Sequence, residues 1–238
     1  MITFVCWKWQ ATGKGGLHPK KKINFTAHHV NTLYSMLSRN LKKPFKLVCI
    51  TDDPRGIDPQ IETLQIWPTW QEMGGCYVRL PVFGSHMKEL IGPDFFSIDL
   101  DVVIVSDITS LVEETRKSHQ FKIWGDTAPF TPYNGSFFFL VTGSRRQVFE
   151  RFDPIASPAL GRRLKYVGTD QAWIGACLGP HEAKWSTADG VYSYRVHFLE
   201  GKRPHLQGGE KIIFFHGAHD PSKPDTQALS PWIAEHWR

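Results

Sequence analysis

Two carboxylates stand in the middle of the most apolar run of the chain, residues 95–105. A run of this length, rich in β-branched and aromatic residues, is typical of a buried strand in an α/β sheet. Asp99 and Asp101 are two residues apart, so in an extended chain both side chains project to one side, roughly 7 Å from each other. Because burying an unpaired carboxylate is costly, this pattern favours a divalent cation with oxygen ligands. The alternative is that both aspartates end a strand and cap the next turn, although an aliphatic run resumes directly after Asp101.

The composition limits the class of protein. With 238 residues, of which 41% are hydrophobic, the chain can bury a core as one large domain or two small ones. No apolar stretch reaches the length of a membrane span, and the strand-like start predicts no signal peptide. Four separated cysteines without a CxxC pair predict reduced, mostly buried thiols in a cytoplasmic protein. The net charge of +5 suits an anionic ligand: a nucleotide, a phospholipid surface or a nucleic acid.

Strands and helices are expected to alternate over the first 100 or so residues. The predicted strands are 2–9, 45–51, 61–66 and 95–105, and the predicted helices are 23–41 and 77–91, with a loop at 67–75. This alternation predicts βαβ units and a largely parallel sheet, whose ligands collect at the carboxyl ends of the strands. Those ends carry Trp7, Lys8, residues 51–53 and the Asp99–Asp101 pair. A glycine- and lysine-rich loop at 11–22 is placed to meet phosphates, or is simply a solvated surface loop.

The second half continues in the same style. We expect strands at 121–126, 136–141 and 211–215, a turn at 133–135, and helices at 144–152, capped by Ser144, and at 169–177. The aromatic tail at 230–237 is expected to pack or dock. No repeat, low-complexity segment or linker is present, so residues 1–238 are predicted to form one domain.

Five motifs in this order resemble the GT-A-fold glycosyltransferases, especially retaining ones such as glycogenin and the lipopolysaccharide galactosyl- and glucosyltransferases. The motifs are an aromatic-x-Arg-Leu start at Tyr77–Leu80, the DxD strand at Phe96–Ile108, an Asn-Gly turn at Tyr133–Phe137, the Asp-Gln pair at Thr169–Gln171, and a C-terminal His motif at Phe215–Gly217 followed by Lys223-Pro224. DxD alone is a weak signal, whereas the ordered set is specific and spans nearly the whole chain. Two departures are the lysine-rich first loop and the looser spacing of the His motif.

The resemblance implies a single GT-A-like, Rossmann-like α/β domain with a mostly parallel central sheet flanked by helices. It implies a nucleotide-binding half at 1–105 and a half for donor sugar and acceptor at 106–238. The implied metal is Mn²⁺ or Mg²⁺ on Asp99, Asp101 and a third ligand, either His216 or His219. The implied catalytic or sugar-binding residues are Asp126, Asn134, Asp170 and Gln171, and the residues expected to bind the nucleotide sugar are Trp7, Lys8, Asp53, Arg79, Asp99 and Lys223.

Simpler interpretations of these residues stay open at this point. Arg79 could instead form a salt bridge on the surface. Asp170 and Gln171 could instead cap a helix, and the strand-end residues could simply be packed in the core. The pair at 28–29 is expected to consist of core or surface histidines without a ligand role.

The implied function is a metal-dependent glycosyltransferase. It would move a hexose from a nucleotide sugar, a UDP-sugar by analogy, to a glycan, glycolipid or other acceptor with retention, in the cytoplasm or at the inner face of a membrane. The residue chemistry agrees, because a metal on two carboxylates and an imidazole stabilises the charge that develops on a diphosphate leaving group. The alternatives are a metal-dependent phosphohydrolase or nucleotidyltransferase, and a non-catalytic nucleotide-sugar-binding module. A nucleic-acid binder is disfavoured, because the basic residues are scattered and no recognition motif accompanies them.

Overall fold

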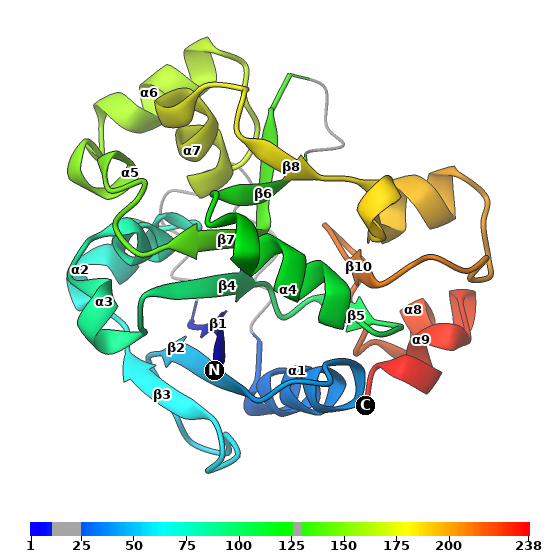
Figure 1. The fold of residues 1–238 in the computed structure, drawn as a ribbon. Coiled ribbons are helices and arrows are strands. Elements are labelled where there is room, and N and C mark those ends of the chain that lie inside the picture. The colour runs from blue at the N-terminus through cyan, green and yellow to red at the C-terminus, as the bar shows by residue number, and fades with distance from the viewer. Residues whose placement is uncertain (11–24, 126–129) are drawn as a thin grey trace.

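A seven-stranded sheet forms the centre of the protein and a three-stranded sheet lies beside it (Figure 1). The computed structural model describes residues 1–10, 25–125 and 130–238. The loop predicted at 11–22 therefore lies outside the described residues. The first 100 residues and the second half both contribute strands to the large sheet, which is the single α/β domain predicted from the sequence.

The large sheet is mostly parallel, as predicted. Its strands are β1 (Ile2–Lys8), β2 (Phe45–Thr51), β3 (Glu62–Gln65), β4 (Asp94–Ile98), β6 (Lys122–Gly125), β7 (Tyr133–Val141) and β8 (Ala183–Trp185). Their order is β3-β2-β1-β4-β7-β6-β8, and β7 runs antiparallel to both of its neighbours. The carboxyl ends of β1, β4 and β6 and the amino end of β7 therefore meet at one edge of the sheet. The small sheet has the order β5 (Val102–Ile104), β10 (Ile212–Phe214), β9 (Val191–Ser193).

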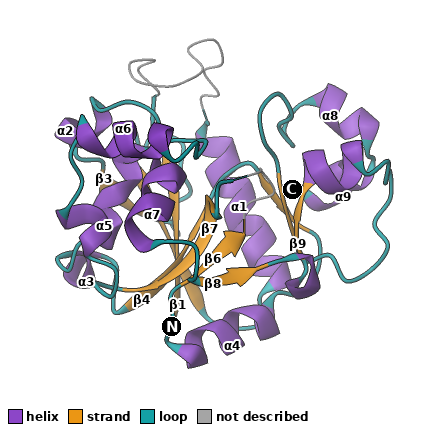
Figure 2. Cartoon of the chain, turned by 90° about the horizontal axis from the view of Figure 1, so that it is seen from above, coloured by secondary structure: helices purple, strands orange, loops and turns teal. Residues whose placement is uncertain are grey.

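Helices cover both faces of the large sheet (Figure 2). On one face, α1 and α4 pack against the side chains of Phe4, Cys6 and Leu47. On the other face, η1, α3, α5 and α7 pack against Val5, Val48 and Phe138. The helices are α1 (Ala27–Asn40), α2 (Pro68–Gln71), the 3₁₀-helix η1 (Tyr77–Phe83), α3 (Met87–Leu90), α4 (Thr109–Ser118), α5 (Gln147–Glu150), α6 (Ala156–Arg163), α7 (Asp170–Leu178), the 3₁₀-helix η2 (Thr187–Asp189), the π-helix η3 (Tyr194–Glu200), α8 (Pro224–Leu229) and α9 (Trp232–His236).

The predicted strand at 95–105 is in fact two strands in two different sheets. β4 ends at Ile98, and β5 begins at Val102 and pairs antiparallel with β10. The chain leaves the large sheet at Asp99–Asp101, because Asp99 N–H bonds Ser136 O at 2.9 Å and Asp101 O accepts from Phe215 N at 2.8 Å. Both aspartates consequently lie in a bend at the carboxyl end of β4 rather than within a continuous strand.

Three other predicted boundaries were wrong for local reasons. The helix expected at 77–91 is η1 followed by α3, since Pro81 lies inside η1 and Gly84 adopts an extended conformation. The turn expected at 133–135 is the start of β7, which pairs there with β6 across a register shift. The helix expected at 144–152 is limited to α5, with Arg146 rather than Ser144 at its N-cap. A short helix, α2, also forms within the predicted loop at 67–75.

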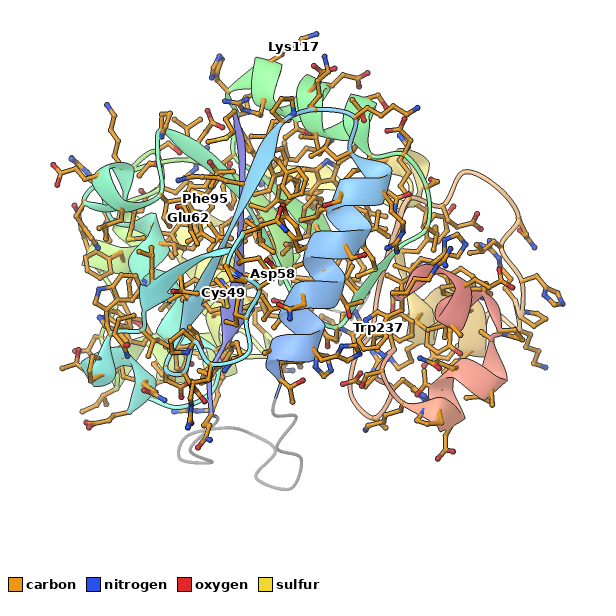
Figure 3. All side chains as sticks on the ribbon, turned by 90° about the horizontal axis from the view of Figure 1, so that it is seen from below. Cys49, Asp58, Glu62, Phe95, Lys117 and Trp237 are labelled. Atoms are coloured by element: carbon orange, nitrogen blue, oxygen red, sulfur yellow. The ribbon has the colours of Figure 1, made fainter. Side chains whose placement is uncertain are left out.

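The aromatic tail at 230–237 packs onto the domain, which is one of the two alternatives predicted for it, packing or docking. Trp232 and Trp237 are buried, and the Trp237 ring lies 5.0 Å from that of His28. Figure 3 shows Trp237 next to α1, and Lys117 at the outer edge of the molecule. All four cysteines are free, and none of the described helices is long and apolar enough to cross a membrane.

Phe96 lies at the centre of an aromatic stack that joins the two halves of the large sheet. Its ring is fully buried and lies 5.2 Å from Phe4 on β1 and 4.9 Å from Phe139 on β7. We predict that Phe96→Ala lowers the free energy of unfolding by about 3–5 kcal/mol, because it removes a buried ring and leaves a cavity. Urea denaturation measures this loss. Leu90→Ala, at an exposed position, is the control and should cost less than about 1 kcal/mol; equal losses would contradict the prediction.

Candidate active site

A buried arginine joins three elements at the edge where the strands end. Arg79 on η1 is 5% exposed. Its Nε donates to Asp170 Oδ2 at 2.8 Å, and its Nη2 lies 2.5 Å from the same oxygen. Its Nη1 pairs with Asp99 Oδ1. Arg79 is thus part of a buried ion-pair network and not a surface salt bridge, and it connects the first residue of α7 to the bend after β4.

Burial and neighbouring charges shift the pKa values of this network in opposite directions. Burial lowers the pKa of Arg79, but Asp170 and Asp99 outweigh burial and keep the pKa well above its usual value. Burial raises the pKa of Asp170, against the opposing effect of Arg79. Burial and the charge of Asp99 also raise the pKa of Asp101. Arg79 therefore stays charged, while the nearby carboxyl groups of Asp170 and Asp101 ionise less readily than exposed ones.

The start of β7 packs directly against this ion-pair network. A Cβ atom added at Gly135 would lie 3.0 Å from both Arg79 Nη2 and Asp170 Oδ2, so only a glycine leaves the ion pair undisturbed. Gln171 Oε1 accepts from Gly135 N at 3.4 Å, and Asn134 Oδ1 accepts from Ser136 N at 2.9 Å. The predicted residues Asn134, Asp170 and Gln171 are thereby brought together with Arg79. Because the Asp170 side chain binds Arg79, its main contact is not that of a helix cap.

His216 follows β10 and lies at the same edge. Its ring stacks on Trp124 with centroids 5.3 Å apart, and its Nε2 is buried without a hydrogen-bond partner among the described residues. Burial lowers the pKa of His216 to about 4, although the charge of Asp99 acts in the opposite direction. The imidazole is therefore neutral at neutral pH. His219 instead packs edge-on against Tyr194 at 5.9 Å.

The described residues contain no preformed cluster of three His, Cys, Asp or Glu side chains suited to a metal ion. Asp99, Asp101 and His216 nevertheless come from adjoining segments, since Asp101 O bonds Phe215 N. A buried imidazole nitrogen without a partner and a carboxylate whose pKa is raised are both groups that a divalent cation would stabilise.

Three polar groups at the carboxyl ends of β1 and β2 lack partners. Lys8 is 7% exposed and forms no side-chain hydrogen bond or ion pair with a described residue. Trp7 Nε1 and Asp52 Oδ1 are buried and also unpartnered within the described part of the chain. Segment 11–24, which follows β1, contains no Asp or Glu that would supply a carboxylate. Unpaired buried polar groups are costly, so this combination is typical of a binding site.

The remaining predicted site residues are more peripheral. Asp53 binds Arg55 in a two-pronged pair at 2.8 and 2.9 Å on the surface, within electrostatic range of Lys8. Lys223 is exposed at the N-cap of α8, and its Nζ lies 3.4 Å from Ala218 O. Asp126 lies outside the described residues.

Sequence reasoning did not single out Trp124, Gly135 or Asp52 as site residues. Trp124 stands near the carboxyl end of β6, the same topological signal that identified Lys8, and this signal could have found it. Gly135 was part of a recognised motif, but only the side chains of Arg79 and Asp170 explain why a glycine stands there. Asp52 belongs to the strand end at 51–53 that the sequence predicts at this edge, but the residue assigned to nucleotide binding there is Asp53.

Solved structures of similar fold were found, whereas no protein-family model and no curated protein sequence matches the chain. The galactosyltransferase LgtC, in complex with donor and acceptor sugar analogs, superposes with a TM-score of 0.59 and 11% identity over 99% of this chain and 96% of LgtC. The glycosyltransferase GlyE of Streptococcus pneumoniae gives 0.60 and 10% over 100% of this chain and 62% of GlyE. Mouse xyloside xylosyltransferase 1, without ligand, gives 0.53 and 13% over 91% and 97%. This similarity shows that the chain has the GT-A fold.

We predict that Arg79→Gln lowers the free energy of unfolding by about 3–5 kcal/mol, because it leaves Asp99 and Asp170 facing each other without a cation. Chemical denaturation at neutral pH measures the loss. The matched control is Arg55→Gln, which breaks the exposed pair with Asp53 and should cost less than about 1 kcal/mol. A loss at Arg79 no larger than that at Arg55 would mean that the buried network does not organise the site.

Proposed function

We propose that this GT-A-fold chain is a metal-dependent hexosyltransferase that uses a nucleotide sugar as donor and transfers the sugar, with retention, to a glycan or glycolipid. The observation that carries this proposal is the unpartnered His216 Nε2 in the segment adjoining Asp99 and Asp101, at the strand edge of a GT-A sheet. The similarity to LgtC over nearly the full length of both chains supports it. LgtC itself was solved with donor and acceptor sugar analogs.

Asp99, Asp101 and His216 would hold the metal, Mn²⁺ or Mg²⁺. Carboxylate oxygens and an imidazole nitrogen suit Mn²⁺ and tolerate Mg²⁺. When bound, the cation supplies positive charge to the diphosphate on which negative charge develops. His216 rather than His219 is the proposed third ligand, because the Nε2 of His216 is unpartnered and its imidazole experiences the charge of Asp99.

The transfer step needs few groups from the protein. An acceptor hydroxyl oxygen forms a bond to C1 of the donor sugar while the bond from C1 to the phosphate oxygen breaks. The nucleoside diphosphate leaves with that electron pair and receives the proton of the hydroxyl. Asp170, Gln171 and Asn134, near Arg79, would hold the sugar hydroxyls and orient C1, which is an effect of positioning.

The nucleotide would bind to the unpartnered polar groups at the carboxyl ends of β1 and β2. Lys8 and Trp7 Nε1 are donors and Asp52 Oδ1 is an acceptor, so together they match a ligand with both phosphate or carbonyl oxygens and N–H or hydroxyl groups. A uridine diphosphate sugar has this mixture. The net charge of +5 further suits an anionic donor, or a glycolipid acceptor at a membrane surface.

The deciding experiment is calorimetric titration with UDP, GDP and CDP, with and without Mn²⁺. We predict Mn²⁺-dependent binding of UDP, weakened by more than about tenfold in Asp101→Asn. Even residues that only hydrogen-bond to a metal ligand change metal affinity by about tenfold or more when they are replaced, and Asp101 is proposed as a ligand itself. Asp107→Asn is the control, because Asp107 is an exposed carboxylate paired with Lys42. If no nucleotide binds with any metal, the transferase proposal fails, and release of phosphate from phosphoesters would be tested instead.

We further predict that Lys8→Met weakens nucleotide binding without lowering stability. The Lys8 side chain forms no hydrogen bond or ion pair with a described residue, so replacing it with an apolar side chain of similar length should not lower the free energy of unfolding. The same change should weaken nucleotide binding by about tenfold, because a charged hydrogen bond to the ligand is lost. Lys117→Met, at an exposed position, is the control and should alter neither quantity. A Lys8→Met protein that is less stable would show that Lys8 has a structural partner.

A further inference from the structure

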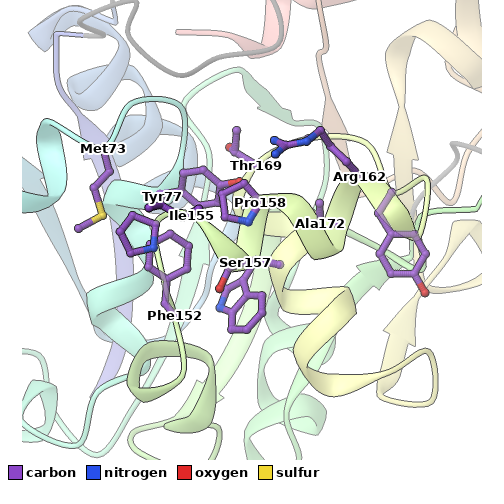
Figure 4. Close-up of a pocket in the computed structure, with 14 residues that line it drawn as sticks. Met73, Tyr77, Phe152, Ile155, Ser157, Pro158, Arg162, Thr169 and Ala172 are labelled. Carbon is purple, nitrogen blue, oxygen red and sulfur yellow. The ribbon is translucent and has the colours of Figure 1, made fainter.

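A pocket opens directly beside the candidate active site. It has a volume of about 380 Å³ and lies between η1 and the segment formed by α5, α6 and the start of α7 (Figure 4). Nothing in the proposed donor and metal sites uses it. Its lining contains Tyr77, Phe152, Ile155, Arg162, Thr169 and Trp173.

The pocket and the Arg79 network share a wall. Thr169 lines the pocket, and the next residue, Asp170, binds Arg79. The Thr169 hydroxyl accepts from Cys76 N at 2.9 Å, and Cys76 O accepts from Arg79 N at 3.0 Å. The contacts therefore run in order from Asp99 through Arg79 and Asp170 to the pocket. A donor sugar held at Asp170 would therefore lie next to the pocket, within reach of an acceptor bound there.

The deep wall of the pocket is aromatic and rigid. The Phe152 ring lies 5.0 Å from that of Tyr77 and 6.0 Å from that of Trp173, whose Nε1 donates to Val148 O at 2.8 Å. Ile155, at the rim, is 82% exposed. Aromatic rings of this kind pack against the apolar face of a sugar ring or against an apolar aglycone.

One cationic side chain lines this largely apolar pocket. Arg162 is the only ionised residue in the lining, which contains no Asp or Glu, and its side chain forms no hydrogen bond or ion pair with a described residue. Figure 4 shows the Arg162 side chain directed toward Thr169. Burial and Asp170 raise the pKa of Tyr77 to about 12, and Arg162 acts against this rise, which places its charge within range of Tyr77. A guanidinium in this position is suited to a planar, bidentate anion.

We propose that this pocket is the acceptor subsite and that it selects an acidic glycoside, whose carboxylate or phosphate pairs with Arg162 while its apolar part packs on Phe152, Tyr77 and Ile155. The inference rests on the proposed transferase function and adds the chemical class of the acceptor. It also explains why the rim of the pocket combines an exposed aliphatic residue with an unpaired arginine.

The test compares two probes that differ in one group, p-nitrophenyl β-D-glucuronide and p-nitrophenyl β-D-glucoside. We predict that the glucuronide binds about tenfold more tightly, the magnitude of one charge-assisted contact. Arg162→Gln should abolish the preference. Arg163→Gln should retain it, because Arg163 is a neighbouring exposed arginine that does not line the pocket. p-Nitrophenyl β-D-glucoside 6-phosphate distinguishes phosphate from carboxylate selection.

Binding is measured by the shift of the Ile155 methyl signal in NMR, with and without UDP and Mn²⁺. Equal affinities for the charged and neutral probes, a preference that survives Arg162→Gln, or binding that leaves the Ile155 signal unchanged would each overturn the proposal. Nucleotide affinity is measured on the same variants and should be unchanged in Arg162→Gln. A failure of the acceptor subsite is thus separable from a failure of the transferase proposal, in which no nucleotide binds.

Discussion

The candidate site depends on one guanidinium buried between two carboxylates. Burying an arginine is tolerated only when its charge is compensated and its donors are used, and Arg79 satisfies both conditions through Asp99 and Asp170. This requirement determines the position of four segments at once: η1, the bend after β4, the first turn of α7, and the start of β7, where Gly135 leaves room for the pair. Segments far apart in the chain are held together at one edge by a single charge balance.

That balance is incomplete in a way that points to a ligand. Asp99, Asp101 and Asp170 are three carboxylates around one guanidinium, and the buried His216 is neutral. Further along the same edge, the Lys8 side chain forms no ion pair with a described residue, although its charge acts on the Asp53 carboxylate. A metal ion beside the carboxyl groups and a diphosphate beside the lysine would suit this distribution of groups. The distribution thereby supports the proposed donor complex.

The sequence predicted the elements better than their boundaries, for reasons visible in particular residues. The spacing of Asp99 and Asp101 and the predicted strand ends indicated which edge of the sheet carries the candidate site, because alternation and topology are local or general rules. The bend between β4 and β5 could not be predicted, since it depends on pairing with β10, more than 100 residues later. The apolar period at 77–91 suggested one helix, but Pro81 and Gly84 divide it. The lack of partners around Lys8 and His216 depends on tertiary burial, which no local pattern encodes.

The two proposed substrate sites also share one structural element. Tyr77 and Arg79 belong to the same 3₁₀ turn, with Tyr77 facing the pocket and Arg79 binding Asp99 and Asp170. The backbone that precedes Arg79 is joined to Thr169 by the hydrogen bond from Cys76 N. The proposed acceptor pocket and the two carboxylates that bind Arg79 are therefore supported by the same 3₁₀ turn and by the start of the same helix.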